Sequence, residues 1–517
     1  MSDVDSNVNA SLKYIARGAG WLFIGAVISK ILAYGFRAFI ARTLSVSDYG
    51  IFNLAVMVTT LAAYIAGLGL TSGLPRYIPY FRARNNSTSV CNTLKFVIKF
   101  TTISSILAAA LVYIFSNQIS YWFNGSIELS ALLKYLSFHI PFSVVGFSII
   151  LSCLLYFGKT KIYSILFNVV MNIIRLGGAM VFVLLGFGIA GVGISYVLSF
   201  IIVTILAFYF LSRTFPIFKT DCKGANEFDA LDFVNYSWPL LFIVIISLIN
   251  GWIDSFMIGH MMTVADVGIY NGALPIAQLM MFAPNLITPL FLPLISRHFA
   301  KNEHSEIKTI SKQVFKWILA ANFFIFLVMF AFPGALINFL FGGNYLAGTQ
   351  TLLILSFGYL ALSLSAPFGQ LLELHKKTKL ILANVLVIIT INILLNYFWI
   401  PAYGINGAAI ATTISNCLLT LLIFAENYVI TKVGALSLAN IKIALAGILP
   451  FLGLLIVRWL TKQHLLTLIV SCMVTFGIYC WMLLKLKVVD EKDKDMLKLI
   501  EQKTNFKFLR TVYNFIK

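Results

Sequence analysis

Charged and amide side chains interrupt several long apolar stretches of this sequence, and chemistry is expected at these positions. Lys30 and Arg37 lie in the first stretch, and Arg175 follows Asn168 and Asn172 in the fifth. An ionised side chain at the centre of a bilayer costs roughly 2.5–3.5 kcal/mol on insertion scales. If these stretches cross a membrane, we expect the three cations to bind an anion.

The spacing of these residues places them on common helix faces. Lys30 and Arg37 are two helical turns apart, which puts them on one face at a separation of about 10 Å. Asn168, Asn172 and Arg175 follow spacings of four and three and form one stripe. Two simpler roles remain open, because a cation can reach the membrane surface or pair with another helix, and asparagines commonly hydrogen-bond between helices.

A second polar pair, Asn250 and Asp254, lies four residues apart in the seventh stretch. Asp254 is expected at the depth of Arg37. We predict that the two pair to close an outer gate, with Asn250 beside the substrate. Two alternatives stay open: Asp254 could bind the proton or sodium ion that drives transport, or the pair could hold the structure together.

The composition identifies the elements that must position these residues. Hydrophobic residues make up 60% of the 517 residues and charged residues 11%, against roughly 45–50% and 25% in soluble domains. The apolar stretches are long enough to span a bilayer. They cover 18–41, 49–70, 94–116, 131–156, 163–186, 189–211, 237–259, 267–294, 315–339, 349–373, 379–400, 405–430, 441–460 and 465–485.

The net charge of +19 is explained by membrane topology and does not indicate nucleic-acid binding. Lysines and arginines collect in the connectors after even-numbered stretches, for example at Arg297 and Lys301. Such connectors are cytoplasmic by the positive-inside rule. We therefore expect a multi-pass protein of the plasma or inner membrane with both termini in the cytoplasm. The six cysteines show no CxxC spacing, and we expect neither a metal site nor a disulfide framework.

An internal duplication divides the chain. The segments 45–55 and 263–273 share the pattern Ser/Thr-Val-x-Asp-x-Gly-Ile-Phe/Tyr-Asn, and further matches follow at nearly the same spacing. In each copy the aspartate suits the capping of the following helix better than substrate binding. The repeat covers six stretches, an even number, so both copies run in the same direction through the membrane. We predict the following divisions: an N-lobe (1–212), a cytoplasmic linker (213–236), a C-lobe (237–432), two further helices (433–485) and a basic amphipathic tail (486–517).

This motif, the arrangement of six, six and two helices, and the Gly-Ile-x-Gly turns before stretches 6 and 12 resemble the MOP flippase superfamily. The resemblance is to its polysaccharide-export branch, the Wzx-type O-antigen and teichoic-acid exporters. It implies a MATE-like, V-shaped pair of lobes around a cationic central cavity. It also implies alternating access that carries a polyprenyl-pyrophosphate- or phosphate-linked oligosaccharide to the outer leaflet. The alternative is an ion-coupled multidrug or metabolite antiporter of the MATE type.

The resemblance also frames the remaining expectations. Arg76 and Arg82 could recruit an anionic head group at the inner mouth, although the positive-inside rule explains them equally well. We expect no catalytic residue, because no outer loop carries the carboxylates of a glycan-processing enzyme. No cofactor is expected beyond a coupling proton or sodium ion. Expected partners are the lipid-linked oligosaccharide, membrane lipids and glycan polymerase or ligase machinery, with no nucleic acid.

The predicted pair of Arg37 and Asp254 can be tested by exchanging the two charges. Reversing either charge alone should lower transport, because it places like charges opposite each other. The double exchange, Arg37→Asp with Asp254→Arg, should restore part of the activity. The measurement is the transport rate of the three variants. A double variant that transports no faster than either single variant contradicts the pairing.

Overall fold

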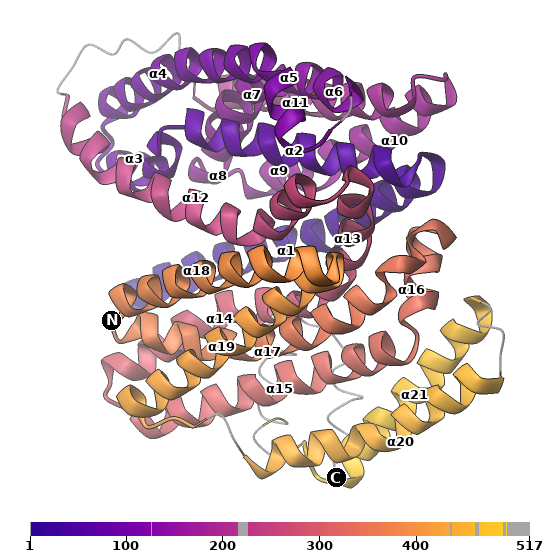
Figure 1. Cartoon of the computed structure of the whole chain (residues 1–517). Helices are drawn as coiled ribbons and strands as arrows, with labels where there is room; N and C mark the ends of the chain where they lie inside the picture. The colour runs from indigo at the N-terminus through magenta and orange to yellow at the C-terminus, as the bar shows by residue number, and fades with distance from the viewer. Residues whose placement is uncertain are drawn as a thin grey trace. The chain divides into compact units, whose positions relative to one another are not determined.

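The protein is described here by a computed structural model that covers residues 2–125, 127–215, 226–434, 437–460, 465–489 and 493. Over these residues the secondary structure is helical, with no strand (Figure 1). The predicted all-α fold class is therefore confirmed. A helix satisfies its backbone hydrogen bonds within one segment, as a chain must where no water reaches it.

The chain forms two compact units, and the first is Met1–Asn271 with Leu340–Gly342. Two of its segments, η1 and η2, are π-helices, a form that often marks functional sites. Its helices are α1 (Ser2–Thr43), α2 (Val46–Ala66), α3 (Leu70–Ala83), α4 (Ser87–Ile114), α5 (Ser116–Trp122), α6 (Ile127–Ser137), α7 (His139–Pro141), η1 (Phe142–Leu151), α8 (Ser152–Tyr156), α9 (Thr160–Ser164), η2 (Ile165–Val170), α10 (Met171–Leu184), α11 (Gly188–Thr214), α12 (Ala230–Met261) and the start of α13 (Val264–Ala277).

The second unit is Gly272–Phe339 with Gly343–Lys517. Within it α17 packs along α19, and α20 packs along α21 (Figure 1). Its helices after α13 are η3 (Gln278–Met281), α14 (Phe282–Ala300), α15 (His304–Ala331), α16 (Pro333–Leu340, which ends in the first unit), η4 (Gly343–Gly348), α17 (Thr349–Leu374), α18 (Thr378–Tyr403), α19 (Ile405–Thr431), α20 (Leu438–Leu460) and α21 (Leu465–Lys485).

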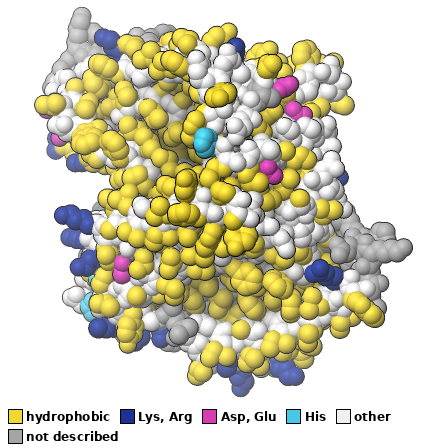
Figure 2. Space-filling view, viewed as in Figure 1, with side chains coloured by type: hydrophobic (Ala, Val, Ile, Leu, Met, Phe, Trp, Pro, Cys, Tyr) yellow, Lys and Arg dark blue, Asp and Glu magenta, His cyan; other side chains and the backbone are white. Residues whose placement is uncertain are grey.

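As predicted, many of the helices are long and apolar enough to span a membrane. Among the described residues, 12 helices are long and apolar enough to span it, or 13 if the bent pair Val264–Thr288 and Phe291–Ala300 is one span. The last predicted span falls on α21, whose apolar helix Ile469–Lys485 is shorter than the others. The count of fourteen therefore stays a prediction. Large apolar side chains cover much of the surface of both units (Figure 2), which is what contact with lipid requires.

The predicted lobes and the two units differ in where they place the seventh span. The lobes follow the sequence repeat and assign this span to the second half. The units follow packing, and α12 packs against α2 and α3, so it lies in the first unit. Parallel lobes therefore stay a prediction. Cys91 is disulfide-bonded, whereas the four other described cysteines are free, so the described residues carry a single bonded cysteine and no disulfide framework.

A buried ion pair anchors the chain beyond α21 to α15. The Lys316 ammonium lies 2.5 Å from the Asp493 carboxylate, and both side chains are more than nine-tenths buried. Gln313 also donates to this carboxylate, as does the Trp317 indole N–H at 2.6 Å. Val488, which is buried beside α20, receives a further hydrogen bond from Lys316. The predicted amphipathic tail otherwise lies outside the described residues.

Removing one partner of this ion pair should destabilise the protein strongly. Asp493→Ala leaves the Lys316 charge buried without its carboxylate, which typically costs about 3–5 kcal/mol. Replacing both partners, as Lys316→Met with Asp493→Leu, should recover most of the stability. Thermal unfolding in detergent measures both effects. The exposed pair Arg84–Glu227 is the matched control, since surface pairs contribute about 0–1 kcal/mol; equal melting shifts at the two sites would contradict the role assigned to Asp493.

Candidate functional site

The two copies of the repeated motif fold in the same way. Ser45 caps α2 and exchanges hydrogen bonds with Asp48, whose side chain accepts from the Ser45 backbone N–H at 3.2 Å. Thr263 and Asp266 repeat this exchange at the start of α13, where the carboxylate accepts from the Thr263 N–H at 3.1 Å. The predicted capping role of the aspartates is therefore confirmed, in the form of a capping box.

The glycines of the motif allow these two helix starts to touch. A Cβ atom on Gly50 would lie 1.9 Å from the Val264 carbonyl oxygen, and one on Gly268 would lie 2.2 Å from the Val46 carbonyl oxygen. Each copy of the motif thus presses its glycine against the backbone of the other. Only glycine permits so close an approach of two backbones. The sequence repeat therefore becomes a contact with approximate two-fold symmetry inside the first unit.

Arg37 and Asp254 both lie close to this contact. Arg37 is beside the Tyr49 hydroxyl, and that hydroxyl is 3.4 Å from the Asn271 carbonyl oxygen, to which it donates. Asp254 is buried and accepts a hydrogen bond of 2.6 Å from the Tyr270 hydroxyl. The two residues therefore lie on α1 and α12, the helices that lead into the two motifs, and each is beside a tyrosine of a motif helix. Their direct pairing stays a prediction.

Lys30 and Asn250 lie on the surface of the first unit. Lys30 is exposed on α1, and Asn250 is exposed on α12, one turn before Asp254. Within the described part of the chain, neither side chain has a hydrogen-bond or ion-pair partner. Both are therefore available to a ligand, and their roles in binding it stay predictions.

The two asparagines of the fifth span bond different neighbours: Asn172 bonds α1, and Asn168 bonds the preceding turn of its own span. Asn172 donates to the Ser29 hydroxyl at 3.1 Å, and Asn168 donates to the Ser164 hydroxyl at 3.2 Å. A Cβ atom on Gly25 would lie 2.9 Å from the Asn168 amide nitrogen, so the helices pack closely here. The Asn172 contact matches the helix-joining role that the sequence left open beside substrate binding.

Arg175 lies against α11 on an aromatic platform. Its guanidinium carbon is 4.3 Å from the centre of the Tyr196 ring and 5.0 Å from that of Phe200. Its Nε donates to the Ser199 hydroxyl at 3.1 Å. Among the described residues the two terminal nitrogens have no hydrogen-bond partner. The platform fixes the plane of the guanidinium through cation–π contact, and binding of an anion by its terminal nitrogens stays a prediction.

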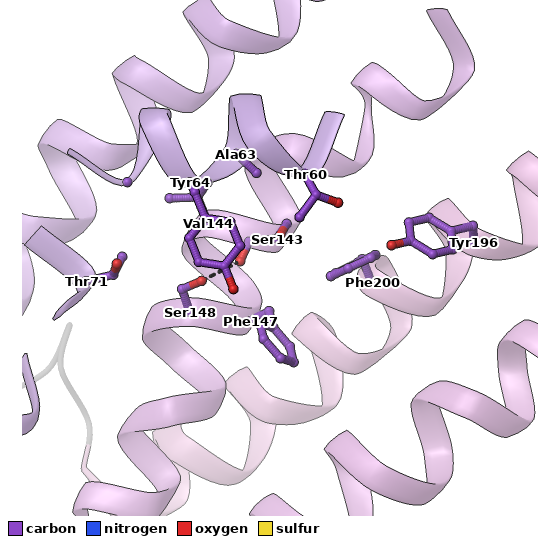
Figure 3. A pocket seen from close by; sticks show the side chains of 11 residues that line it. Thr60, Ala63, Tyr64, Thr71, Ser143, Val144, Phe147, Ser148, Tyr196 and Phe200 are labelled. Carbon is purple, nitrogen blue, oxygen red and sulfur yellow. Dashed lines mark hydrogen bonds between the residues drawn. The ribbon is translucent and has the colours of Figure 1, made fainter. Parts of the chain in front are cut away.

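The same two rings line a hollow in the first unit, of about 100 Å³ (Figure 3). Side chains from α2, α3, η1 and α11 point toward it, and none of them is charged. The lining residues are Thr60, Ala63, Tyr64, Gly67, Thr71, Ser143, Val144, Phe147, Ser148, Tyr196 and Phe200. His139 packs edge-on against Tyr196 from within the protein, and its Nε2 has no partner among the described residues.

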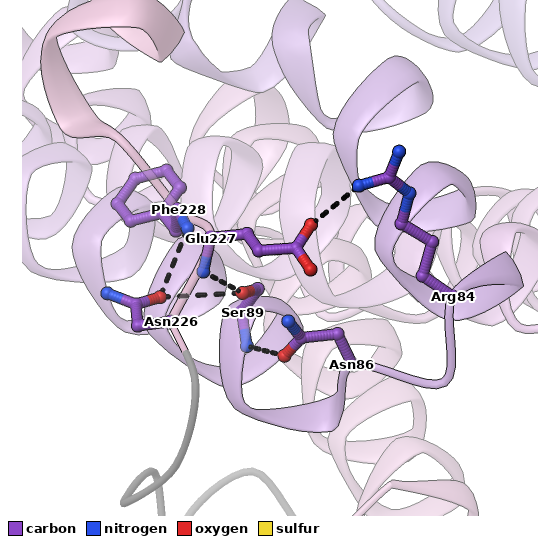
Figure 4. Close-up of polar contacts among 6 residues, drawn as sticks. All are labelled: Arg84, Asn86, Ser89, Asn226, Glu227 and Phe228. Carbon is purple, nitrogen blue, oxygen red and sulfur yellow. Dashed lines mark hydrogen bonds and ion pairs between the residues drawn. The ribbon is translucent and has the colours of Figure 1, made fainter.

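The two predicted inner-mouth arginines, and Arg84 near them, contact the protein itself. Arg76 lies over the Tyr236 ring at 4.3 Å, and Arg82 donates to the Tyr156 carbonyl oxygen at 2.6 Å. Arg84 pairs with Glu227 at 2.9 Å (Figure 4). The segment around Glu227 is docked, because its backbone N–H donates to Ser89 at 2.8 Å. These contacts give the arginines a structural role, and head-group recruitment by Arg76 and Arg82 stays a prediction.

The sequence-based argument missed the aromatic platform and the hollow. Tyr196 and Phe200 sit four residues apart in an apolar stretch, a spacing that also suits ordinary helix packing. The hydroxyl-bearing residues Thr60 and Thr71 are equally unremarkable in sequence. Only the position of Arg175 over the two rings connects them to the predicted anion site.

Comparison with known proteins identifies the family. The family described as "Polysaccharide biosynthesis protein" matches residues 15–299, more than half of the chain. The chain belongs to this family. The family described as MatE matches residues 239–398. These matches confirm the predicted membership of the MOP superfamily, a class of membrane transporters rather than enzymes.

Similar sequences come from archaea and bacteria. An uncharacterised membrane protein of Methanocaldococcus jannaschii is 22% identical over 94% of this chain and 98% of its own length. A protein of Haloferax volcanii described as a probable low-salt glycan biosynthesis flippase, Agl15, is 23% identical over 79% of this chain and 82% of its own. The capsular polysaccharide biosynthesis protein CapF of Staphylococcus aureus is 23% identical over 78% of this chain and 96% of its own.

Solved structures confirm the fold. The lipid II flippase MurJ, in an inward closed conformation, aligns with a TM-score of 0.67 over 89% of this chain and 97% of its own, at 16% identity. A multidrug-resistance transporter of the MATE family, in an inward-facing conformation, aligns with a TM-score of 0.57 over 78% and 94%, at 15% identity. The described chain therefore has the fold shared by MATE transporters and MurJ.

The glycine contact predicts a specific sensitivity to one methyl group. Gly50→Ala or Gly268→Ala should each lower stability by about 1–3 kcal/mol, because the new Cβ overlaps a backbone carbonyl and forces the helices apart. Gly177→Ala in α10 is the matched control, since its Cβ would have no neighbour within 4 Å. Thermal unfolding in detergent measures all three. Equal stability of the Gly50 and Gly177 variants would mean that the two motifs do not touch.

Proposed function

We propose that the protein is a flippase that carries an anionic, lipid-linked oligosaccharide from the cytoplasmic to the outer leaflet. The lipid anchor would be a polyprenyl pyrophosphate or phosphate. The main support is Arg175, a guanidinium within a membrane span whose terminal nitrogens have no partner among the described residues. The family and the glycan-related names of its relatives point in the same direction.

The physical argument rests on the cost of moving a phosphate through hydrocarbon. A pyrophosphate loses its hydration in the bilayer core, and an unpaired arginine is itself expensive there. Bringing the two together removes both penalties. A guanidinium offers two parallel N–H donors to phosphate oxygens, and the stacked rings hold that edge in place. Lys30, exposed on α1, would add a second cation.

In this proposal the lobes alternate their opening around the bound head group. Contact at the two repeated motifs, near Arg37 and Asp254, closes one end of the path. Asp254 would pair with Arg37 there, or bind a coupling proton or sodium ion. Both termini would lie in the cytoplasm, and Arg76 and Arg82 would face the incoming lipid. Glycan polymerase or ligase machinery would take the cargo on the outer side.

The MATE-type antiporter remains the alternative, because the MatE family matches residues 239–398. Antiport of cationic drugs needs acidic groups along the path. The exposed ammonium of Lys30 and the unpaired terminal nitrogens of Arg175 would repel a cationic cargo.

Arg175→Met should lower transport of a fluorescent polyprenyl-pyrophosphate oligosaccharide by roughly 10- to 100-fold in proteoliposomes. That range corresponds to about 1.5–3 kcal/mol for hydrogen bonds to a charged group. Arg175→Lys should not restore the rate, because an ammonium cannot make the bidentate contact. Arg213→Met in α11 serves as the control, since Arg213 stacks on Tyr209 outside the platform.

Two results would overturn the proposed function. Wild-type protein that leaves the anionic lipid in place but exchanges a cationic dye for protons would identify an antiporter. Equal transport by the Arg175→Met and Arg213→Met variants would remove the argument from Arg175.

A further inference from the structure

Exposed lysine and arginine side chains gather at one end of the second unit, and Figure 2 shows Lys and Arg side chains at its left edge. They come from the turn between α14 and α15, the turn between α17 and α18, and the helix ends beside them. The positive-inside rule explains why cations collect on one side of a membrane protein, but not how they are held. We call this surface the basic rim, and its residues are Arg297, Lys301, Lys308, Lys376, Lys377 and Lys379.

Ring contacts hold the two turns of the basic rim together. The Phe299 ring, near the end of α14, lies 5.1 Å from the His375 ring, which follows α17. The same ring lies 6.3 Å from that of His304, the first residue of α15. Within the first turn, His298 and Glu303 are 2.6 Å apart. The two turns are therefore fixed next to each other, and so are the cations that they carry.

The cations of the basic rim are unpaired among the described residues. None of the six side chains has a hydrogen-bond or ion-pair partner there. Of the nearby acids, Glu303 is already engaged by His298. The arginines of the first unit differ, since Arg76 and Arg82 are held against protein groups. The rim therefore presents a dense positive charge to a partner outside the chain.

One lysine of the rim has a backbone conformation that favours glycine. Lys376 follows the end of α17 with a φ of 58°, and the Lys377 N–H donates to the Leu372 carbonyl oxygen at 2.9 Å to close the turn. Glycine is the usual residue at such a position, because a side chain strains the left-handed backbone. A cation at a helix C-terminus recovers part of that strain through the helix dipole. The charge of Lys376 is thus kept where a neutral residue would fit the backbone better.

An apolar stripe of α18 continues directly from the rim. Leu382 and Leu386 are both exposed and follow Lys379 at spacings of three and seven, so the three share one helix face. Exposed leucines on a spanning helix are expected to face lipid tails. A cation at the end of such a stripe then lies at the depth of the lipid phosphates. Clusters of lysine and arginine in this position are typical of anionic-lipid binding, which favours a lipid over an acidic protein as the partner.

We propose that the basic rim binds the anionic head groups of phospholipids in the surrounding membrane. The lysines supply point charges, and Arg297 offers two parallel N–H donors to phosphate oxygens. Anionic phospholipids such as phosphatidylglycerol collect beside the second unit in preference to neutral ones. Binding of bulk phospholipid at the rim is independent of the cargo that Arg175 would bind in the first unit.

The test measures lipid binding to the full chain in a neutral detergent. Dansyl-labelled phosphatidylglycerol or phosphatidylcholine is titrated in, and energy transfer from tryptophan reports binding. Wild-type protein should bind phosphatidylglycerol more tightly, and added salt should weaken this binding. The triple variant Lys301→Gln/Lys377→Gln/Lys379→Gln should weaken it by roughly 100-fold at low ionic strength, because each lysine near an anionic surface contributes a factor of about five.

Two further variants separate lipid binding from net charge and from folding. Lys95→Gln/Lys99→Gln/Lys159→Gln removes the same charge from exposed lysines of the first unit and should leave the binding of phosphatidylglycerol nearly unchanged. Lys376→Gly removes one rim charge and relieves the left-handed backbone. It should therefore melt at no lower a temperature than wild type and still bind phosphatidylglycerol more weakly.

Three results would contradict the lipid site. Equal losses of binding in the two triple variants would mean that net positive charge alone attracts the lipid. Wild-type protein that binds both lipids equally would show no anionic preference to explain. If a poly-glutamate peptide binds wild type, phosphatidylglycerol does not, and the rim triple variant loses the peptide, the rim is a docking surface for an acidic protein.

Discussion

The absence of water inside a bilayer determines how the polar residues of this protein are used. A polar atom without a partner is costly there, so most bond within the chain or are available to a ligand. Hydroxyl side chains commonly satisfy this by donating to a carbonyl one turn earlier, as Thr59 and Ser356 do. Asparagines join helices instead, as Asn322 does to the Met280 carbonyl oxygen. Some polar atoms have no partner among the described residues: only one nitrogen of Arg175 is bonded, and the Nε2 of His139 is unpaired.

This constraint also explains what the sequence could predict. Long apolar stretches predict spanning helices, and twelve or thirteen are present among the described residues. The repeated Asp-x-Gly motif predicts helix caps, because serine, threonine and aspartate at that spacing bond the exposed backbone of a helix start. The position of Arg175 in an apolar stretch marks it as unusual whatever the fold. Each of these inferences needs only local sequence and the physics of a membrane.

Contacts between distant segments could not be predicted in the same way. Asp493 belongs to a charged tail in sequence, but the structure buries it against α15. Tyr196 and Phe200 resemble ordinary packing residues until Arg175 is placed over them. The repeat is also imperfect in its polar partners, since Asn168 bonds Ser164 whereas its counterpart Asn384 bonds Glu426. Such choices depend on which side chains meet in space, and no spacing along the chain encodes them.

The reciprocal glycine contact has a consequence for how the two halves can change over time. Gly50 faces the backbone of the second motif, and Gly268 faces the backbone of the first. A duplicated gene ordinarily frees one copy to drift, because the other copy keeps the original role. Here each copy is the surface on which the other packs, so neither glycine is redundant. A side chain added to either glycine would displace the helix start of the other copy, so a change in one half is transmitted to the other at this point.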